Sequence, residues 1–193
     1  MDSRPFGVID GKAVGTFVEQ QFRQALLDSG FEISGNSALG IDLPELNADI
    51  KVTSVKQPQS SSPYRSARQK VYGLGYSLLL FVYDKTDDPQ RKAARLDFKH
   101  CVFIEKSVTG DYQTIFGLLK ILANNGNQEE VASFLAERNL PLDELGLEAL
   151  SGEIIAQPPS LGYLTLSNAL QWRLQYARAL NEAGKVEGVL RIV

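Results

Sequence analysis

The sequence predicts an α/β fold in which a mixed β-sheet lies between helices and an α-helical part follows it. Apolar residues recur at helical spacing near the start of the chain and through its last third, whereas the middle holds short apolar runs typical of strands. Residues 77–83 read Ser-Leu-Leu-Leu-Phe-Val-Tyr, which indicates a central strand that is buried on both faces. Helices before, between and after such strands are typical of a layered α/β core.

The composition limits the class of protein. The chain has 193 residues, 44% of them hydrophobic, and a net charge of -3, which fits one domain with at most a small appendage. No apolar run approaches the length of a membrane span, and residues 1–5 lack the apolar stretch of a secretory signal. The single cysteine, Cys101, excludes an internal disulfide, so we expect a reducing, cytoplasmic setting and no membrane partner.

The first helix is predicted over residues 12–29, because six apolar residues recur there at helical spacing and Gly30 follows. Glu19 lies at the margin of the apolar stripe, where a carboxylate is either a rim group or a buried group with a partner. After it we expect a short strand at 31–33, a polar turn at 34–38, and strands at 41–43 and 48–55 joined by a tight connection.

The rest of the chain follows from the same patterns. A polar loop at 57–62 leads to a second predicted helix at 63–76, the central strand at 77–83, a turn at 84–89 and a strand within 95–105. Helices are then predicted at 111–124, 128–138, 142–150 and 165–183. This order divides the chain into a core over residues 1–124 and a helical C-terminal region over residues 125–193.

Two acids and a lysine are concentrated around the strand predicted at 48–55. Side chains alternate between the two faces of a strand, so Asp49, Lys51 and Thr53 share one face. The preceding turn delivers a second carboxylate, Asp42. Two carboxylates and an ammonium group can hold a divalent cation beside an activated water, which is the equipment for phosphodiester hydrolysis. The same residues could instead be the polar face of an edge strand.

These residues resemble the PD-(D/E)xK nuclease superfamily in its Asp-x-Lys variant, and within it the group of the mismatch-repair endonuclease MutH and related restriction endonucleases. The resemblance rests on the short spacing from Asp42 to Asp49-x-Lys51 and on the segment 14–19, Val-Gly-Thr-Phe-Val-Glu, which is similar to that group's first-helix pattern. It covers residues 11–55 in detail. Two departures are an aspartate at Asp49, where many members have glutamate, and a longer gap between Glu19 and Asp42.

The resemblance implies a restriction-endonuclease-like fold, a nuclease core over residues 1–124 and a Mg²⁺ cofactor. Asp42 and Asp49 would ligate the ion, with the Ala48 or Ile50 main-chain carbonyl as a further oxygen. Lys51 would position the attacking water and help to deprotonate it. Glu19 would hold a water of the ion or a second ion. Catalytic residues are therefore expected at Asp42, Asp49, Lys51 and Glu19, with both aspartates and Glu19 as metal ligands.

A basic stretch follows the predicted catalytic strand. Residues 51–70 contain five lysines and arginines and no acid. Amide and hydroxyl groups there could read base edges and the cations could contact phosphates, although a solvated loop and a solvated helix explain them equally well. The candidate DNA-binding residues are Lys56, Gln57, Gln59, Ser60, Arg65, Arg68 and Lys70.

The hypothesis from sequence is a bacterial type II restriction endonuclease that cuts a short duplex DNA site with Mg²⁺ and without an organic cofactor. Cutting both strands of a symmetric site needs two active sites, so a homodimer is expected. A repair-type, nicking or structure-specific nuclease of the same fold and a non-enzymatic DNA-binding protein stay open as alternatives. The C-terminal helices would serve either target recognition or dimerisation.

Overall fold

The predicted fold class is confirmed by the computed structural model, which describes residues 5–32, 40–62, 66–167 and 172–193. The main sheet has the strand order β1-β3-β4-β7, with β1 parallel to β3 and the other pairs antiparallel. Its strands are β1 (Ala48–Ser54), β3 (Ser77–Asp88), β4 (Ala93–Ile104) and β7 (Val189–Arg191). A small sheet has the order β2-β6-β5, formed by β2 (Gln59–Ser62), β6 (Trp172–Gln175) and β5 (Thr165–Leu166).

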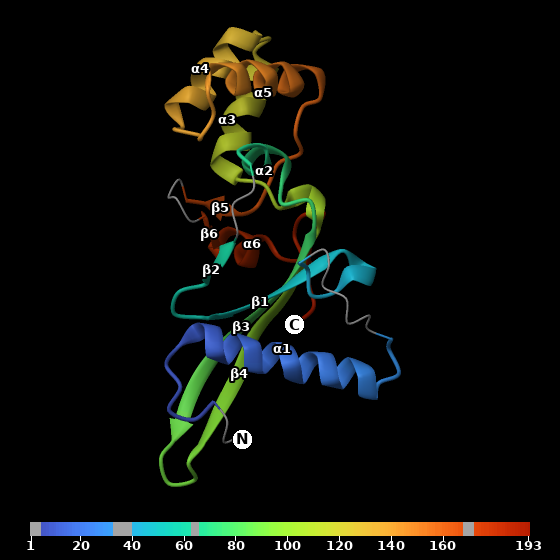
Figure 1. Ribbon diagram of the computed structural model, residues 1–193, viewed down its shortest axis with the longest axis vertical. Coiled ribbons are helices and arrows are strands. Elements are labelled where there is room, and N and C mark those ends of the chain that lie inside the picture. Colours follow the sequence, from blue (N-terminus) through green and yellow to red (C-terminus); the bar gives the residue numbers. More distant parts are fainter. Residues whose placement is uncertain (1–4, 33–39, 63–65, 168–171) are drawn as a thin grey trace.

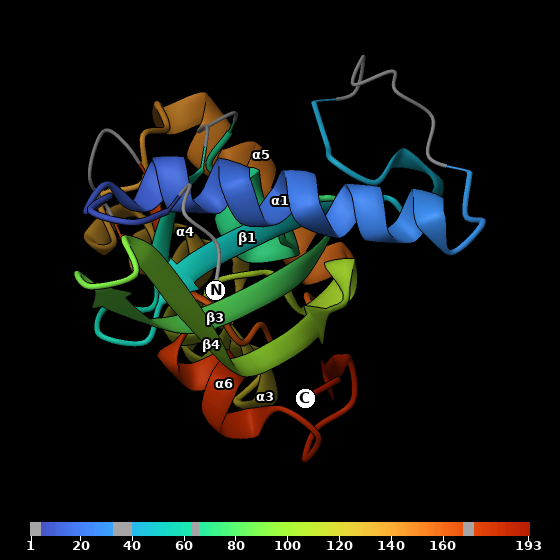
Figure 2. The same cartoon turned by 90° about the horizontal axis from the view of Figure 1, so that it is seen from below.

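Helices and the small sheet cover the two faces of the main sheet unequally. Helix α1 (Gly11–Asp28) crosses one face, over β1 and β3, while α6 (Ala177–Glu182) and the small sheet pack on the other (Figures 1 and 2). The difference is visible along β3. Leu78, Leu80 and Val82 are completely buried against the small-sheet side, whereas Leu79 and Phe81 on the α1 side are only half-buried. The central strand is therefore not closed equally on both faces.

A second core lies at the far end of the molecule (Figure 1). It is built by α2 (Arg68–Tyr72), α3 (Tyr112–Ala123), α4 (Gln128–Glu137) and α5 (Glu144–Ala156). Helices α3, α4 and α5 agree to within a few residues with the helices predicted at 111–124, 128–138 and 142–150. The exception is the end of α5, which lies six residues beyond the predicted end. The helix predicted at 63–76 is much shorter in the structure, because Gly73 and Gly75 take φ values of +85° and +86° and end it.

The single helix predicted at 165–183 is wrong. The segment forms β5, β6 and the short helix α6 instead. Leu174 and Tyr176 are buried and Arg173 and Gln175 are exposed, which is the period-two pattern of a strand. The apolar residues of this segment also fit a helical spacing, and pairing with β2 decides between the two.

Smaller differences concern the connections. The segment predicted as a strand at 41–43 makes only a single bridge, between Leu43 and Ala48. The loop predicted at 57–62 contains β2, and the turn predicted at 84–89 is displaced because β3 continues to Asp88. Residues 31 and 32 form no strand, and residues 33–39, which include the predicted turn, lie outside the described residues.

The last residues return to the main sheet. Strand β7 pairs with β4, and its Val189 is completely buried in the core. The helical part after residue 125 is thus followed by a strand that completes the sheet, and the division of the chain at that residue stays a prediction. Within the described ranges, the structure contains no helix with the length and apolar character of a membrane span.

Asp111 ties the helical part to the small sheet. Its carboxylate accepts hydrogen bonds from the Thr114 amide (2.9 Å) and hydroxyl (2.6 Å), which caps α3, and from the Leu166 amide (2.9 Å) in β5. The side chain is 3% exposed. Its loss leaves buried donors without an acceptor, so it costs more than the loss of an ordinary cap.

We therefore predict that Asp111→Ala lowers the free energy of unfolding by about 2–4 kcal/mol in urea denaturation followed by circular dichroism. Asp143→Ala is the matched control, because Asp143 caps α5 from an exposed position through one bond, to the Gly146 amide. That variant should cost about 1 kcal/mol. Equal losses in the two variants would contradict the assignment.

Candidate active site at the edge of strand β1

A tight turn places Asp42 opposite the start of β1. The short 3₁₀ helix η2 (Pro44–Leu46) reverses the chain, and Asn47 adopts the left-handed conformation at φ +46°. Leu43 and Ala48 then exchange both main-chain hydrogen bonds, at 2.9 and 3.1 Å. This geometry lets an Asp42 carboxylate oxygen accept a hydrogen bond from the Ile50 amide at 2.9 Å. The seven-residue spacing between the two aspartates is therefore the length of this turn.

The alternation of β1 brings the predicted catalytic pair together. The Lys51 ammonium lies 2.5 Å from an Asp49 carboxylate oxygen. Ile50 packs on the opposite face of the strand, in the cluster that contains Phe22 and Leu26 of α1. Asp49 is 7% exposed, so its carboxyl group has little water around it.

Helix α1 supplies two further charged groups. Glu19 is half-buried and hydrogen-bonds with the Asp42 side chain. One turn later, the Arg23 guanidinium donates a hydrogen bond to the Asp42 main-chain carbonyl. The sequence analysis missed Arg23, although its position four residues after Glu19 puts it on the same side of the helix. The structure thus joins Glu19, Asp42, Asp49 and Lys51 in one cluster and adds Arg23 to it.

The carboxyl groups of this cluster compete for protons. Burial, together with the hydrogen bond to Asp42, raises the pKa of Asp49 to about 6. Burial and the neighbouring charge of Asp42 raise the pKa of Glu19 as well. Burial alone would raise the pKa of Asp42, but hydrogen bonds from Asp49 and the Ile50 amide, with the charges of Lys51 and Arg23, lower it below its ordinary value. Asp42 is therefore the shared acceptor of the cluster.

This donor set fits a hard divalent cation. The buried Asp49 and the half-buried Asp42 repel each other when both are ionised, and a cation between them would reduce that repulsion. In the described part of the chain, no three His, Cys, Asp or Glu side chains form a ready-made cage for an ion. Mg²⁺ does not need one, because it keeps several waters and usually binds one or two carboxylates together with phosphate oxygens.

The segment that follows β1 contains four of the predicted DNA-binding residues in two different environments. Lys56 and Gln57 are exposed on the turn between β1 and β2, which Thr53 stabilises through its hydroxyl contacts with the main chain of this turn. Gln59 and Ser60 belong to β2, and the Ser60 hydroxyl is 2.5 Å from that of the buried Tyr176. Lys56 and Gln57 are therefore the freer candidates for DNA contact.

Of the three remaining candidate DNA-binding residues, the two that the structure describes are already held in contacts within the protein. Arg68 forms a bidentate pair with Glu153, with its Nε 3.0 Å from both carboxylate oxygens, and its guanidinium lies 4.4 Å from the Tyr72 ring centre. Lys70 is 3% exposed, and its burial lowers the pKa of its ammonium group. A contact between Lys70 and a phosphate would require this core to open. Arg65 lies outside the described residues.

The comparisons with known proteins agree on one family. A family model described as type II restriction enzyme NspV matches residues 2–191 of the chain. A curated protein of that name from a Nostoc species is 50% identical over 187 residues, which are 97% of this chain and 85% of that protein. No solved structure matches the chain. The matched span of the family model contains the turn, β1 and the part of α1 that form the cluster.

The raised pKa of Asp49 gives a first prediction for the metal-free protein. The folded state binds a proton between about pH 4 and pH 6 that the unfolded state has lost, so this group's contribution to stability is full below that window and disappears as the pH rises through it. Asp49→Asn removes the repulsion, and we expect it to stabilise the metal-free protein at pH 8 by roughly 1–2 kcal/mol. Thermal unfolding in EDTA measures this.

Carbon-13 NMR of the aspartate carboxyl groups supplies the direct check, since a titration near pH 6 should be present in the wild type and absent from Asp49→Asn. Asp28→Asn is the control, because Asp28 is exposed at the end of α1. Destabilisation of the metal-free protein at pH 8 by Asp49→Asn would show that the two aspartates do not repel each other.

Proposed function

The chain belongs to the family of the type II restriction enzyme NspV, and from this premise we propose that it is a Mg²⁺-dependent endonuclease that hydrolyses duplex DNA at a short specific site. The observation that carries the proposal is the cluster of Glu19, Asp42, Asp49 and Lys51 at the edge of β1. Family membership favours a restriction enzyme over the repair-type and non-enzymatic alternatives, and the PD-(D/E)xK assignment remains part of this proposal.

In this proposal Asp42 and Asp49 hold the ion, and Glu19 borders the site from α1. Bound Mg²⁺ would polarise the scissile phosphate and make a water more acidic. The buried position of Asp49 supports its role as a metal ligand, because the interaction between a carboxylate and a cation is stronger where there is little water. The hydrogen bonds that Asp42 accepts from the Ile50 amide and that its carbonyl accepts from Arg23 fix its position before any ion binds.

Lys51 has the role of orienting the attacking water and balancing charge on the phosphate. Its ammonium group is held by Asp49 in the metal-free protein, at 2.5 Å. With a cation bound at Asp49, the Lys51 ammonium would be available to interact with the water or with a phosphate oxygen. The ion pair with Asp49 therefore holds the Lys51 ammonium group next to the proposed metal site.

DNA recognition would begin at the turn after β1. Lys56 would contact a phosphate, and Gln57 would reach a base edge in the adjoining groove. Both lie within six residues of Lys51 along the chain, so contact there orients the duplex directly beside the cleavage site. Cleavage of both strands of a symmetric site calls for two copies of the chain, and we propose a homodimer.

We predict that Lys51→Ala, Asp42→Ala and Asp49→Ala each abolish Mg²⁺-dependent cleavage of plasmid and phage DNA, by a factor of about 10³ or more, because each removes a group that touches the ion, the water or the phosphate. Wild-type enzyme should give discrete fragments that disappear in EDTA. Retention of full activity in any one variant would remove that residue from the active site.

The control for these variants is Lys85→Ala, because Lys85 forms a similar short pair with Asp87 at the far end of β3. It should cut like the wild type. Gel-shift binding in Ca²⁺ should show that the three active-site variants still bind the specific duplex, which separates lost chemistry from lost folding.

A separate prediction concerns Lys56. Lys56→Ala should weaken binding of all duplex sequences by a similar factor and lower the slope of log affinity against log salt concentration by about 1, because one phosphate contact is lost. Lys99→Ala, on β4, is the control and should leave the slope unchanged. An unchanged slope in Lys56→Ala would exclude the phosphate contact, and fluorescence anisotropy at several salt concentrations measures it.

A further inference from the structure

Part of one face of the main sheet has no cover among the described residues. Helix α1 packs over β1 and β3 and against Leu96 and Phe103 of β4, but the same face continues to β7, and a groove of about 530 Å³ lies open there. The register places Leu79, Phe103 and Leu190 in one row across three strands. Ile192 and Val193 continue this surface just after β7 and are 58% and 67% exposed. We call this surface the open face.

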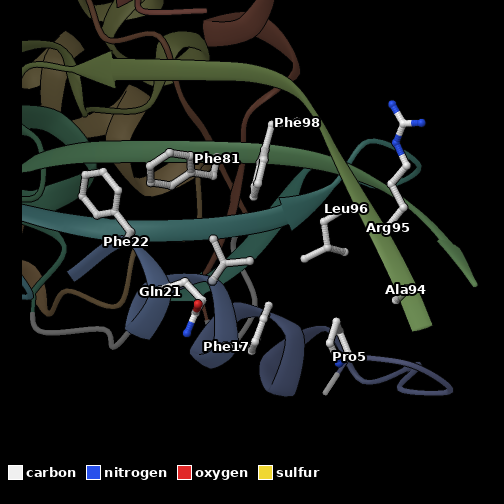
Figure 3. Close-up of a pocket in the computed structure, with 10 residues that line it drawn as sticks. Pro5, Phe17, Gln21, Phe22, Phe81, Ala94, Arg95, Leu96 and Phe98 are labelled. Atoms are coloured by element: carbon white, nitrogen blue, oxygen red, sulfur yellow. The ribbon is translucent and has the colours of Figure 1, made fainter. Parts of the chain in front are cut away.

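A row of aromatic rings forms the boundary between the covered and open parts. The rings of Phe22 and Phe81 are 5.1 Å apart and those of Phe81 and Phe98 are 5.8 Å apart, both in edge-to-face geometry. Figure 3 shows the three rings side by side from α1 across β3 to β4. A second cavity, of about 400 Å³, shares these rings and extends under α1 toward Phe17 and Leu96. The open face is therefore continuous with the surface on which α1 packs.

The chemistry of the open face suits an apolar partner. The groove across β3, β4 and β7 is lined by no charged side chain. Phe98, Leu190 and Ile192 are 42%, 45% and 58% exposed, so three large apolar residues of this face lie in contact with water. Half-exposed neighbours such as Phe103 add to this apolar surface. A stable dimer buries about 800 Å² on each partner, so the open face is a suitable centre for such an interface.

We propose that the open face is the homodimer interface, occupied by the open face of a second copy. This inference rests on the proposed function, since two copies are required to cut two strands. An apolar groove without charged side chains can be its own complement across a two-fold axis, which is the condition for a closed dimer. An acidic or basic partner would find no group to pair with in the groove.

The location also explains how the interface serves the site. Phe22 lies three residues after Glu19 on α1, so one helix contacts both the open face and the carboxylate cluster. Docking of a second copy against the aromatic row fixes the position of α1 and with it Glu19 and Arg23. The interface thus positions residues of each active site, in addition to bringing two sites to one duplex.

The test uses the double variant Leu190→Glu/Ile192→Glu of the full chain in sedimentation velocity. Wild type should have twice the chain mass at micromolar concentration, and the variant should be monomeric, with a dissociation constant raised at least 100-fold, because two charges would lie in a dry interface. Leu145→Glu is the matched control, since Leu145 is 76% exposed on α5, and it should remain dimeric. Circular dichroism confirms that each variant is folded.

A double variant that remains dimeric would place the interface elsewhere.

Failure of the proposed interface can be distinguished from failure of the proposed nuclease function. A wild type that cuts DNA as a stable monomer would overturn the interface and leave the nuclease assignment intact. A dimer that dissociates in the double variant but never cuts DNA would support the interface and overturn the function. If both proposals hold, the double variant should convert supercoiled plasmid to the nicked form rather than the linear form.

Discussion

The structure of the candidate site depends on the repulsion between carboxyl groups that the fold brings into contact. Asp42, Asp49 and Glu19 meet at the edge of β1, where burial removes the water that would screen their charges. The protein offsets this cost with the Ile50 amide and with two cations, Lys51 and Arg23, and below about pH 6 with a proton on Asp49, whose pKa is raised to about 6. In the proposed function, a divalent cation bound between Asp42 and Asp49 would replace the proton and reduce their repulsion. Local instability of this kind is characteristic of functional sites.

The edge position of β1 is what allows three separate segments to reach this site. In the described main sheet β1 has a partner only on one side, β3, so its other edge is accessible to the turn before it and to α1. Asp49 and Lys51 share the face that looks toward the small sheet, while Ile50 and Val52 pack under α1. The strand therefore carries the candidate catalytic residues Asp49 and Lys51 on one face and packs, through the other face, against the helix that supplies Glu19. A central strand could not do both, since its two edges would be occupied by hydrogen-bonded neighbours.

What could be predicted from sequence was mainly local. The pairing of Asp42 with Asp49 follows from a tight turn, and the pairing of Asp49 with Lys51 follows from strand alternation, so both were predicted and are found together in space. Arg23 was missed because its partner is a main-chain carbonyl, which no sequence pattern marks. Lys70 is predicted from sequence as a candidate phosphate contact, with a solvated helix as the alternative, yet packing of α2 against the helical core buries it. The strands of the small sheet were missed because β5 and β6 are two and four residues long and depend on pairing with a distant segment.

The asymmetry of the main sheet links the two proposals physically. A sheet buried on one face by a small sheet and α6 must still remove its other face from water, and α1 packs on β1 and β3 and on β4 only at Leu96 and Phe103. Extension of the sheet by β4 and β7 therefore creates apolar surface that the described part of the chain leaves uncovered, at a cost of about 25 cal/mol for each Å² left in water. The same extension binds the end of the chain into the core through Val189. In our proposals, a second copy would cover this surface, recover that free energy and, through Phe22, hold the helix that carries Glu19. The proposed interface and the proposed active site are therefore connected through α1, which contacts both.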